Sequence, residues 1–381
     1  MLVFLWFSII HCDSPSLVVL ILFGSTEMTK IDLSNVEDLL MVYMNVDSTT
    51  GKEGSFGNLV DESLVDNGWI VEKQQVDGDP SRFNLLASRK PLAEKAPLIV
   101  FNTHLDTVPP YIPPTEDKMN IYGRGSNDAK GQLACMVSAA QFLVESHPAV
   151  ADRLALLFVV GEEVDHIGMT KANDFVGLNP DYLIVGEPTE MKFATIQKGA
   201  LKVIVRCKGI AGHSGYPSQG KSAIHMLIPV LNDVLNYEWP SDAVLGSTTV
   251  NIGIIEGGQA QNAWAENAHA RIFFRVTTSV ADIQRKLESI VGGRASIEIT
   301  SYNEPVVLSP APLDLPTDQV AFNTDLPYFN RLSTLKGKYL FGAGSIKNAH
   351  SKDEFVPKKE LHHYRQSLIN LAIKLCSNSS A

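Results

Sequence analysis

Short apolar runs alternate with segments of helical periodicity along the first half of the chain. Residues 97–101, 154–160 and 182–185 are almost wholly apolar and end at polar or glycine residues. Apolar positions recur at helical spacing in residues 32–45 and 131–146. Because strands without a polar face are typical of a sheet covered on both sides, this pattern predicts an α/β core.

Beyond residue 198 the pattern changes to alternating strands and further helices. The predicted strands cover residues 200–208, 248–255 and 269–276, and the predicted helices cover residues 221–236 and 280–291. Alternating strands combined with helices are typical of a two-layer α+β unit. A short strand at 338–341 and a closing helix at about 359–376 then resume the first pattern.

The predicted layout is therefore one α/β domain interrupted by a smaller α+β unit. We assign residues 28–197 and 306–381 to the main domain and residues 198–305 to an insert, with an apolar leader at 1–27. Within the main domain, the glycines at positions 51, 54 and 57 predict a loop after the first helix.

The leader allows three interpretations. Residues 1–24 are strongly apolar, contain neither Lys nor Arg, and carry one acid, Asp13. A secretory signal peptide would make the protein secreted, whereas translation from Met28 would make it cytoplasmic. The third interpretation is a membrane anchor. Because the two apolar pieces are each too short to span a bilayer, we expect no stable membrane insertion.

Composition and charge exclude several classes of protein. The 381 residues correspond to about two domains, and the net charge of −10 without long basic runs argues against nucleic-acid binding. The four cysteines are scattered and form no CxxC pair, which argues against a disulfide framework and against a cysteine zinc site. They are Cys12, Cys135, Cys207 and Cys376.

Polar residues follow the predicted buried strands. His104 and Asp106 come after the apolar run at 97–101, and residues i and i+2 of a strand point to the same face. This spacing suits a metal-bound histidine that a neighbouring acid orients, although a solvated loop pair is the alternative. Glu162 and Glu163 follow the run at 154–160, where two adjacent acids need a compensating positive charge unless they form an exposed turn.

Two further acids and a second histidine extend this set. Glu187 follows the run at 182–185, His350 follows a glycine-rich loop, and Asp128 precedes the helix at 131, where an N-cap is its alternative role. Open α/β sheets place ligands beyond the carboxyl ends of their strands. Two histidines and three carboxylates match the ligand count of a two-zinc hydrolytic site, in which one carboxylate bridges the ions.

The motifs that carry these residues resemble, in the same order, those of the M20 metallopeptidase family. They are HLDTVPP (104–110), GRGSNDAKG (123–131), GEE (161–163), GEPT (186–189), GHSG (212–215) and AHSKDE (349–354). The family includes acetylornithine deacetylases, succinyl-diaminopimelate desuccinylases, aminoacylases and carboxypeptidases. Within it, RFNLLAS, LLFVVGEE and KGALKVIV are most similar to fungal secreted carboxypeptidase-like proteins.

The resemblance implies a fold and a set of metal ligands. The main domain would be a catalytic domain with a mixed sheet covered by helices, and the insert a lid or dimerisation domain of a possible homodimer. Two Zn²⁺ per chain are implied, with Co²⁺ or Mn²⁺ as alternatives. Their ligands would be His104 and Glu187 for one ion and Glu163 and His350 for the other, with Asp128 bridging both.

The resemblance also implies catalytic and substrate-binding residues. Glu162 would be the general base and acid, and Asp106 would orient His104. His213 would stabilise the oxyanion, often across a dimer, and the substrate would be held by Asn262, Arg275 and the loop around Gly344. The sequence departs from the usual family pattern at Ala129 and at Ala263-Trp264, which leaves the metal ligands intact but changes the surroundings of the substrate.

These residues predict a hydrolase that cleaves an amide or peptide bond next to a free carboxylate. A carboxypeptidase is the first interpretation and an N-acyl-amino-acid deacylase the second, because pocket shape decides between them. A non-catalytic binding protein on the same scaffold would be expected to lack a ligand or the base, and none is missing. A dinucleotide-dependent oxidoreductase is disfavoured because GRGSNDAKG does not match G-x-G-x-x-G.

Overall fold

The computed structural model describes residues 30–92, 94 and 96–378. The predicted leader at 1–27 and Cys12 lie outside these residues. The other three cysteines, Cys135, Cys207 and Cys376, are buried. No helix among the described residues has both the length and the apolarity needed to cross a bilayer.

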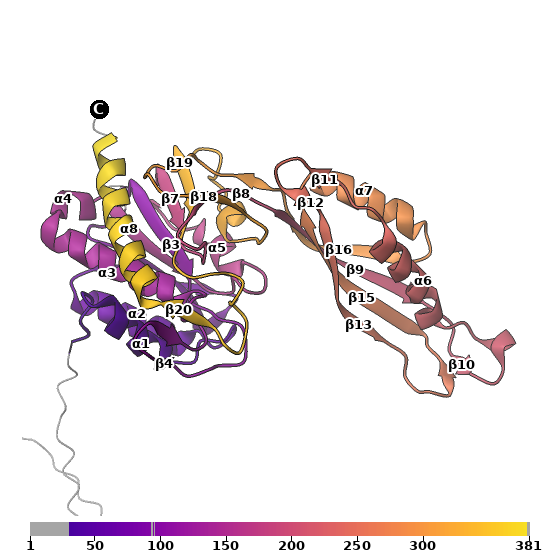
Figure 1. Ribbon diagram of the computed structural model, residues 1–381. Helices are drawn as coiled ribbons and strands as arrows, with labels where there is room; N and C mark the ends of the chain where they lie inside the picture. The colour runs from indigo at the N-terminus through magenta and orange to yellow at the C-terminus, as the bar shows by residue number, and fades with distance from the viewer. Residues whose placement is uncertain (1–29, 93, 95, 379–381) are drawn as a thin grey trace, which may run out of the picture. The chain divides into compact units, whose positions relative to one another are not determined.

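A six-stranded mixed sheet forms the centre of the main domain (Figure 1). Its strand order is β1-β2-β6-β3-β7-β19. The four strands from β6 to β19 run parallel, and β2 is antiparallel to both of its neighbours, β1 and β6. The strands are β1 (Ile70–Val76), β2 (Asp79–Ser88), β3 (Ile99–His104), β6 (Leu154–Val159), β7 (Tyr182–Val185) and β19 (Gly337–Leu340). Strands β3 and β6 are buried at every position, as their unbroken apolar sequences predict.

Helices cover this sheet. Helix α3 packs against β3, β6 and the neighbouring helices α1 and α8, whereas α5 and α2 pack against β1 and β2. The helices are α1 (Val36–Met44), α2 (Gly54–Asp66), α3 (Lys130–Ser146), α4 (Pro148–Ala151), α5 (Ile167–Ala172) and α8 (Lys358–Asn378). The predicted helices at 32–45, 131–146 and 359–376 are therefore confirmed.

The loop predicted from Gly51, Gly54 and Gly57 is wrong in part. Only Gly51 lies in a turn, with a φ of +92°, whereas α2 begins at Gly54. A Cβ at Gly57 would lie 2.9 Å from a ring carbon of Phe83 on β2, and one at Gly54 would lie 2.4 Å from the carbonyl oxygen of Ser81. These glycines therefore allow a helix to approach the sheet closely, which outweighs their weak helix propensity.

Two small sheets join distant segments of the main domain. Strand β20 pairs with β5. This pairing brings the segment before β20, which carries the predicted ligand His350, beside the loop after β5, which carries the predicted ligand Asp128. The sheets comprise β4 (Thr115–Glu116), β5 (Asn120–Tyr122) and β20 (Phe355–Pro357), and β8 (Phe193–Gln197), β17 (Val306–Val307) and β18 (Thr317–Val320).

The insert is a four-stranded antiparallel sheet with two helices on one face. The strand order is β13-β15-β9-β16, and the elements are β9 (Gly199–Lys208), α6 (Ala223–Asn236), β13 (Thr249–Gly257), β15 (Asn267–Val276), α7 (Val280–Val291) and β16 (Ser296–Asn303). Two short ladders complete it: β10 (Gly212–His213) with β14 (Ala263–Trp264), and β11 (Ser241–Asp242) with β12 (Gly246–Ser247). The predicted α/β fold with a smaller α+β insert is confirmed.

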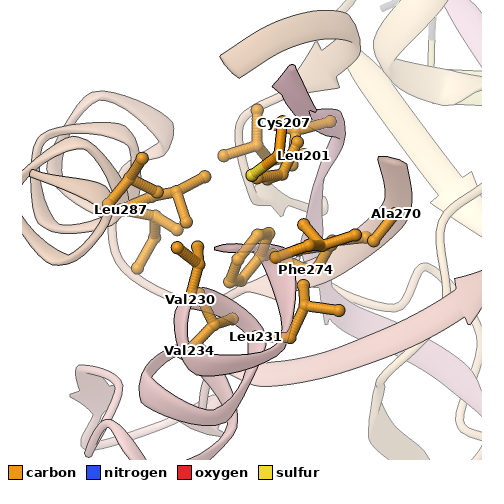
Figure 2. Packing of buried hydrophobic residues seen from close by; sticks show 14 of the residues in the cluster. Leu201, Cys207, Val230, Leu231, Val234, Ala270, Phe274 and Leu287 are labelled. Carbon is orange, nitrogen blue, oxygen red and sulfur yellow. The ribbon is translucent and has the colours of Figure 1, made fainter. Parts of the chain in front are cut away.

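Alternation along the strands builds the core of the insert. Every second residue of β15 is buried, from Ala268 to Val276. Figure 2 shows Phe274 of β15 among Val230, Leu231 and Val234 of α6, with Leu287 of α7 nearby. The apolar stripes of both helices therefore cover one face of this sheet.

Truncation of Phe274 should destabilise the insert. The side chain is fully buried, so Phe274→Ala removes apolar contacts and leaves a cavity. We expect the free energy of unfolding, measured by chemical denaturation, to fall by about 3–5 kcal/mol. The control Val244→Ala changes a side chain that is 56% exposed and should leave stability nearly unchanged. A similar small effect for both variants would contradict this account of the core.

Candidate active site

His104 is the last residue of β3 and points one ring nitrogen into a cluster of acids. Its side chain is buried, and Nδ1–H donates to the carbonyl oxygen of Asp106 at 2.8 Å. That hydrogen bond leaves Nε2 facing Asp128 Oδ1 at 3.1 Å and Glu187 Oε1 at 3.8 Å. The tautomer that suits a metal ligand is thereby selected by the backbone of the residue two positions on.

The carboxylate of Asp106 holds the adjacent acidic turn in place. It accepts the backbone N–H groups of Glu162 at 3.1 Å and Glu163 at 3.2 Å, and the hydroxyl of Thr50 at 2.9 Å. Its nearest approach to His104 Nδ1 is 3.5 Å. Burial alone would raise the pKa of Asp106, but His104 and these donors keep it below the usual value. Asp106 thus orients the Glu162-Glu163 backbone directly, a contact that the sequence did not predict.

Asp128 lies between the two histidines. Its Oδ1 is 3.1 Å from His104 Nε2, and its Oδ2 is 3.2 Å from His350 Nε2. The alternative role as N-cap of α3 does not occur, because Ala129 occupies the cap position and no side chain caps the helix. Each carboxylate oxygen therefore faces a different histidine, which is the arrangement required of a bridging ligand.

Two potential metal-binding groups share Asp128. His104 and Glu187 form one group with it, and Glu163 and His350 form the other. Glu163 Oε2 lies 3.0 Å from His350 Nε2, whereas Glu163 Oε1 is buried and has no hydrogen-bond partner among the described residues. An unpaired buried carboxylate oxygen is costly, so this atom fits a site for a cation. The structure brings all five predicted ligands together in the predicted grouping.

The electrostatics of the cluster also favour a cation. Burial raises the pKa of Glu187 well above its usual value, and the charge of Asp128 raises it further. Burial and the charge of Asp128 likewise raise the pKa of Glu163. In turn, hydrogen bonds with Asp128 and Glu163 raise the pKa of His350 to about 10. The cluster thus carries more negative charge than its own residues neutralise.

Glu162 faces the same pocket. The pocket is lined by Asp128, Glu162, Glu163, His166, Glu187, Lys202, Phe273, Arg275, Phe322, Asn323, Ile346 and His350. Burial raises the pKa of Glu162 well above its usual value, and the charge of Glu187 contributes. Adjacent side chains diverge, so Glu163 reaches His350 while Glu162 lies 3.7 Å from His166. A carboxyl group with a raised pKa beside a metal-type cluster is suited to proton transfer.

Two supporting residues, Glu354 and His166, were not identified from the sequence. Glu354 accepts the backbone N–H groups of Gly125, Asn127 and Asp128 at 2.9–3.2 Å and pairs with Arg124, which fixes the loop that carries Asp128. His166 donates to Asp325 at 3.0 Å and stacks on Tyr328. The position of Glu354 within AHSKDE, beside a predicted ligand, was the available signal; His166 gave none.

The structure separates the four predicted substrate-binding residues. Arg275 lines the pocket, but His213 and Asn262 are not among its lining residues. Both are exposed. His213 ends β10 and Asn262 directly precedes β14, which pairs with β10, and Ser214 N–H donates to Asn262 O at 2.9 Å. The Gly344 N–H donates to Glu360 at 2.8 Å, so this amide is already occupied. Roles for His213, Asn262 and Gly344 at the substrate therefore stay predictions.

Sequence comparisons find relatives that are similar to this protein over most of its length. A family profile described as a peptidase dimerisation domain matches residues 195–296. A Peptidase M20 domain-containing protein of Schizosaccharomyces pombe is 35% identical over 330 residues, which is 86% of this chain and 81% of the relative. A probable carboxypeptidase of Aspergillus niger is 34% identical and covers 92% of this chain and 93% of its own length.

Solved structures share the fold at lower identity. A tripeptidase from Staphylococcus aureus aligns with a TM-score of 0.73 at 20% identity and covers 91% of this chain and 99% of its own. An M20 family metallo-carboxypeptidase from Sulfolobus solfataricus aligns with a TM-score of 0.69 at 16% identity over the same shares. The resemblance seen in the motifs is thus confirmed along nearly the whole length of the described chain, and the protein belongs to the M20 peptidase family.

Proposed function

We propose that this protein is a two-zinc carboxypeptidase that releases the C-terminal residue of a peptide. The observation that carries the proposal is the pair of histidine–carboxylate groups that share Asp128. Nitrogen and carboxylate donors of this kind suit zinc, although Co²⁺ or Mn²⁺ accept the same donors. His104 and Glu187 would hold one ion, Glu163 and His350 the other, and Asp128 both.

Metal ions held in this way would acidify a water molecule and polarise the scissile carbonyl group. Glu162 accepts a proton from the attacking water, and its carboxyl group then gives that proton to the nitrogen of the departing residue. The oxygen of the water forms a bond to the carbonyl carbon, and the carbon–nitrogen bond breaks as the amine leaves. Glu162 therefore ends the reaction in the protonation state in which it began. Asp106 supports this step by fixing the backbone of Glu162 through the N–H contact at 3.1 Å.

Arg275 supports a substrate with a free carboxylate. Its guanidinium group lines the pocket that contains Glu162 and the metal-binding groups. Planar guanidinium groups bind carboxylates through two parallel hydrogen bonds. The Aspergillus niger relative bears the name probable carboxypeptidase, which favours a peptide over an N-acyl amino acid.

An N-acyl-amino-acid deacylase is the second candidate, because Arg275 would hold the carboxylate of an acylated amino acid equally well. A hydrolysis screen of dipeptides against N-acyl amino acids separates the two. The enzyme should be assayed with added zinc and again with a chelator. Faster hydrolysis of the N-acyl series would replace the carboxypeptidase assignment with the deacylase.

Replacing the base should slow turnover strongly without loss of metal. Glu162→Gln preserves the shape of the side chain but removes its capacity to accept a proton. We expect kcat to fall by about 10²–10⁴-fold while metal content, measured by elemental analysis, stays unchanged. Glu145→Gln, at an exposed position of α3, serves as the matched control. Near-normal turnover of the Glu162→Gln enzyme would refute its role as base.

Removing the bridging carboxylate should reduce metal binding. Asp128→Ala takes away the group that lies between His104 and His350, so two cations would face each other with less negative charge between them. Elemental analysis should then give fewer than two zinc ions per chain, whereas the exposed control Asp174→Ala should retain both. Two tightly bound ions in the Asp128→Ala protein would show that another residue bridges them.

The exposed position of His213 favours a role across a homodimer. Mixing inactive His213→Ala protein with inactive Glu162→Gln protein creates mixed dimers. If His213 acts on the partner's site, each mixed dimer has one site with both residues intact, and activity should recover to at most roughly a quarter of wild type. If His213 closes over its own site, every site keeps one defect. No recovery in demonstrated mixed dimers would reject the cross-dimer role.

A further inference from the structure

Two cations of the insert sheet face the acidic cluster across the pocket. Lys202 lies on β9 and Arg275 on β15, and both line the pocket with Glu162. In the antiparallel register Lys202 pairs with Phe273 and Ala200 pairs with Arg275. Because residues i and i+2 share a face, Lys202 and Arg275 project from the same side of the sheet at diagonal positions.

Neither cation has a carboxylate partner in the part of the chain that the structure describes. Among the described residues, no acidic side chain lies within ion-pair distance of Lys202 or Arg275. The Arg275 guanidinium instead lies 4.2 Å from the ring centre of Phe273, and the Lys202 ammonium lies 5.5 Å from the same ring. Burial lowers the pKa of both groups, although the charge of Glu162 opposes this change. Such unneutralised, half-buried charge is costly unless a ligand supplies anions.

The two cations exceed what one carboxylate requires. A guanidinium group by itself can hold the terminal carboxylate through paired hydrogen bonds. The Lys202 ammonium has three N–H donors, and its one hydrogen bond among the described residues goes to the carbonyl oxygen of Val164 at 2.7 Å. Donors and charge therefore remain for a second anionic group, and Phe273 and Phe322 offer apolar surface to the methylene groups between two carboxylates.

We propose that the departing residue of the substrate is a dicarboxylic amino acid, aspartate or glutamate, with Lys202 binding its side-chain carboxylate and Arg275 its terminal carboxylate. This inference rests on the proposed function, since it assigns the specificity of the same site. It holds for a peptide that ends in an acidic residue and for an N-acylated acidic amino acid, because both present the same pair of carboxylates.

The test compares matched acidic and neutral substrates on the zinc-loaded, full-length enzyme. The peptide arm uses acetyl-alanyl-glutamate and acetyl-alanyl-glutamine, and the acyl arm uses N-acetylglutamate and N-acetylglutamine. We expect kcat/KM for the glutamate member of the favoured arm to exceed that of its glutamine partner by about 10-fold or more. The series that the enzyme hydrolyses shows whether the dicarboxylic residue is released from a peptide or from an N-acyl amino acid.

Lys202→Gln isolates the charge from the hydrogen bond, because an amide can still donate to the carbonyl of Val164. This variant should bring the glutamate-to-glutamine ratio close to one, mainly by raising KM for the glutamate substrate. Lys202→Arg should keep the preference. The control Lys208→Gln changes an exposed lysine on the same strand and should leave the ratio as in wild type.

The outcomes separate this inference from the proposed function. Release of glutamine as fast as glutamate by the wild-type enzyme overturns the inference and leaves the carboxypeptidase assignment intact. An unchanged ratio in Lys202→Gln also overturns it, because Lys202 would then only anchor the loop at Val164. Hydrolysis of none of the four substrates, or of any other peptide or N-acyl amino acid, rejects the proposed function itself. If Lys202→Gln does not fold, product inhibition decides: free glutamate should inhibit wild type more strongly than glutamine.

Discussion

The crowding of Asp128, Glu162, Glu163 and Glu187 is the constraint on which the surrounding structure depends. Four carboxylates in one largely buried pocket repel one another, and burial removes the water that would screen them. Part of this charge is offset by His104 and His350, and the strong upward shift of their pKa values shows how much positive charge the site demands. Divalent cations would satisfy that demand without protonation of the candidate ligands.

Rigid supports keep the carboxylates in place. Three of them follow the parallel strands β6 and β7, whose carboxyl ends meet at the same edge of the main sheet as that of β3. The loops beyond the strands are then fixed by buried acids that are not ligands. Asp106 holds the backbone of Glu162 and Glu163, and Glu354 holds the loop of Asp128. Because these two acids hold the backbone, the candidate ligands can direct their own oxygen atoms into the cluster.

The insert contributes positive charge to the pocket. Its strands contribute Lys202, Arg275 and the ring of Phe273 to a pocket whose other wall is acidic. The proposed substrate, with a scissile carbonyl group at one end and anionic groups at the other, matches this polarity. His213 and Asn262 are exposed on another part of the insert and do not line this pocket.

The sequence by itself determined the main strands, most helices, the interrupted domain order and the five candidate ligands. Unbroken apolar runs identify strands that are buried on both faces, and the acids directly after them are confined to one edge of a parallel sheet. These are local signals, so they can be read without the fold. The sequence predicted a loop at the start of α2, because glycine has a weak helix propensity. Gly54 and Gly57 instead allow the helix to lie close to Ser81 and Phe83 of β2, and local propensity contains no information about such a contact.

Only the tertiary structure decided which residues support the site and which line its pocket. Glu354 reaches the loop of Asp128 across more than two hundred residues of sequence. The carboxylate of Asp106 accepts the backbone N–H of Glu162, and the backbone carbonyl of Asp106 accepts Nδ1–H of His104 and so orients its ring. In the sequence, Lys202 is one polar position of a predicted alternating strand. The pairing of β9 with β15 places it diagonally opposite Arg275 on the same face of the sheet. Contacts of this kind depend on the pairing of strands and loops far apart in the chain, and no periodicity along the sequence encodes them.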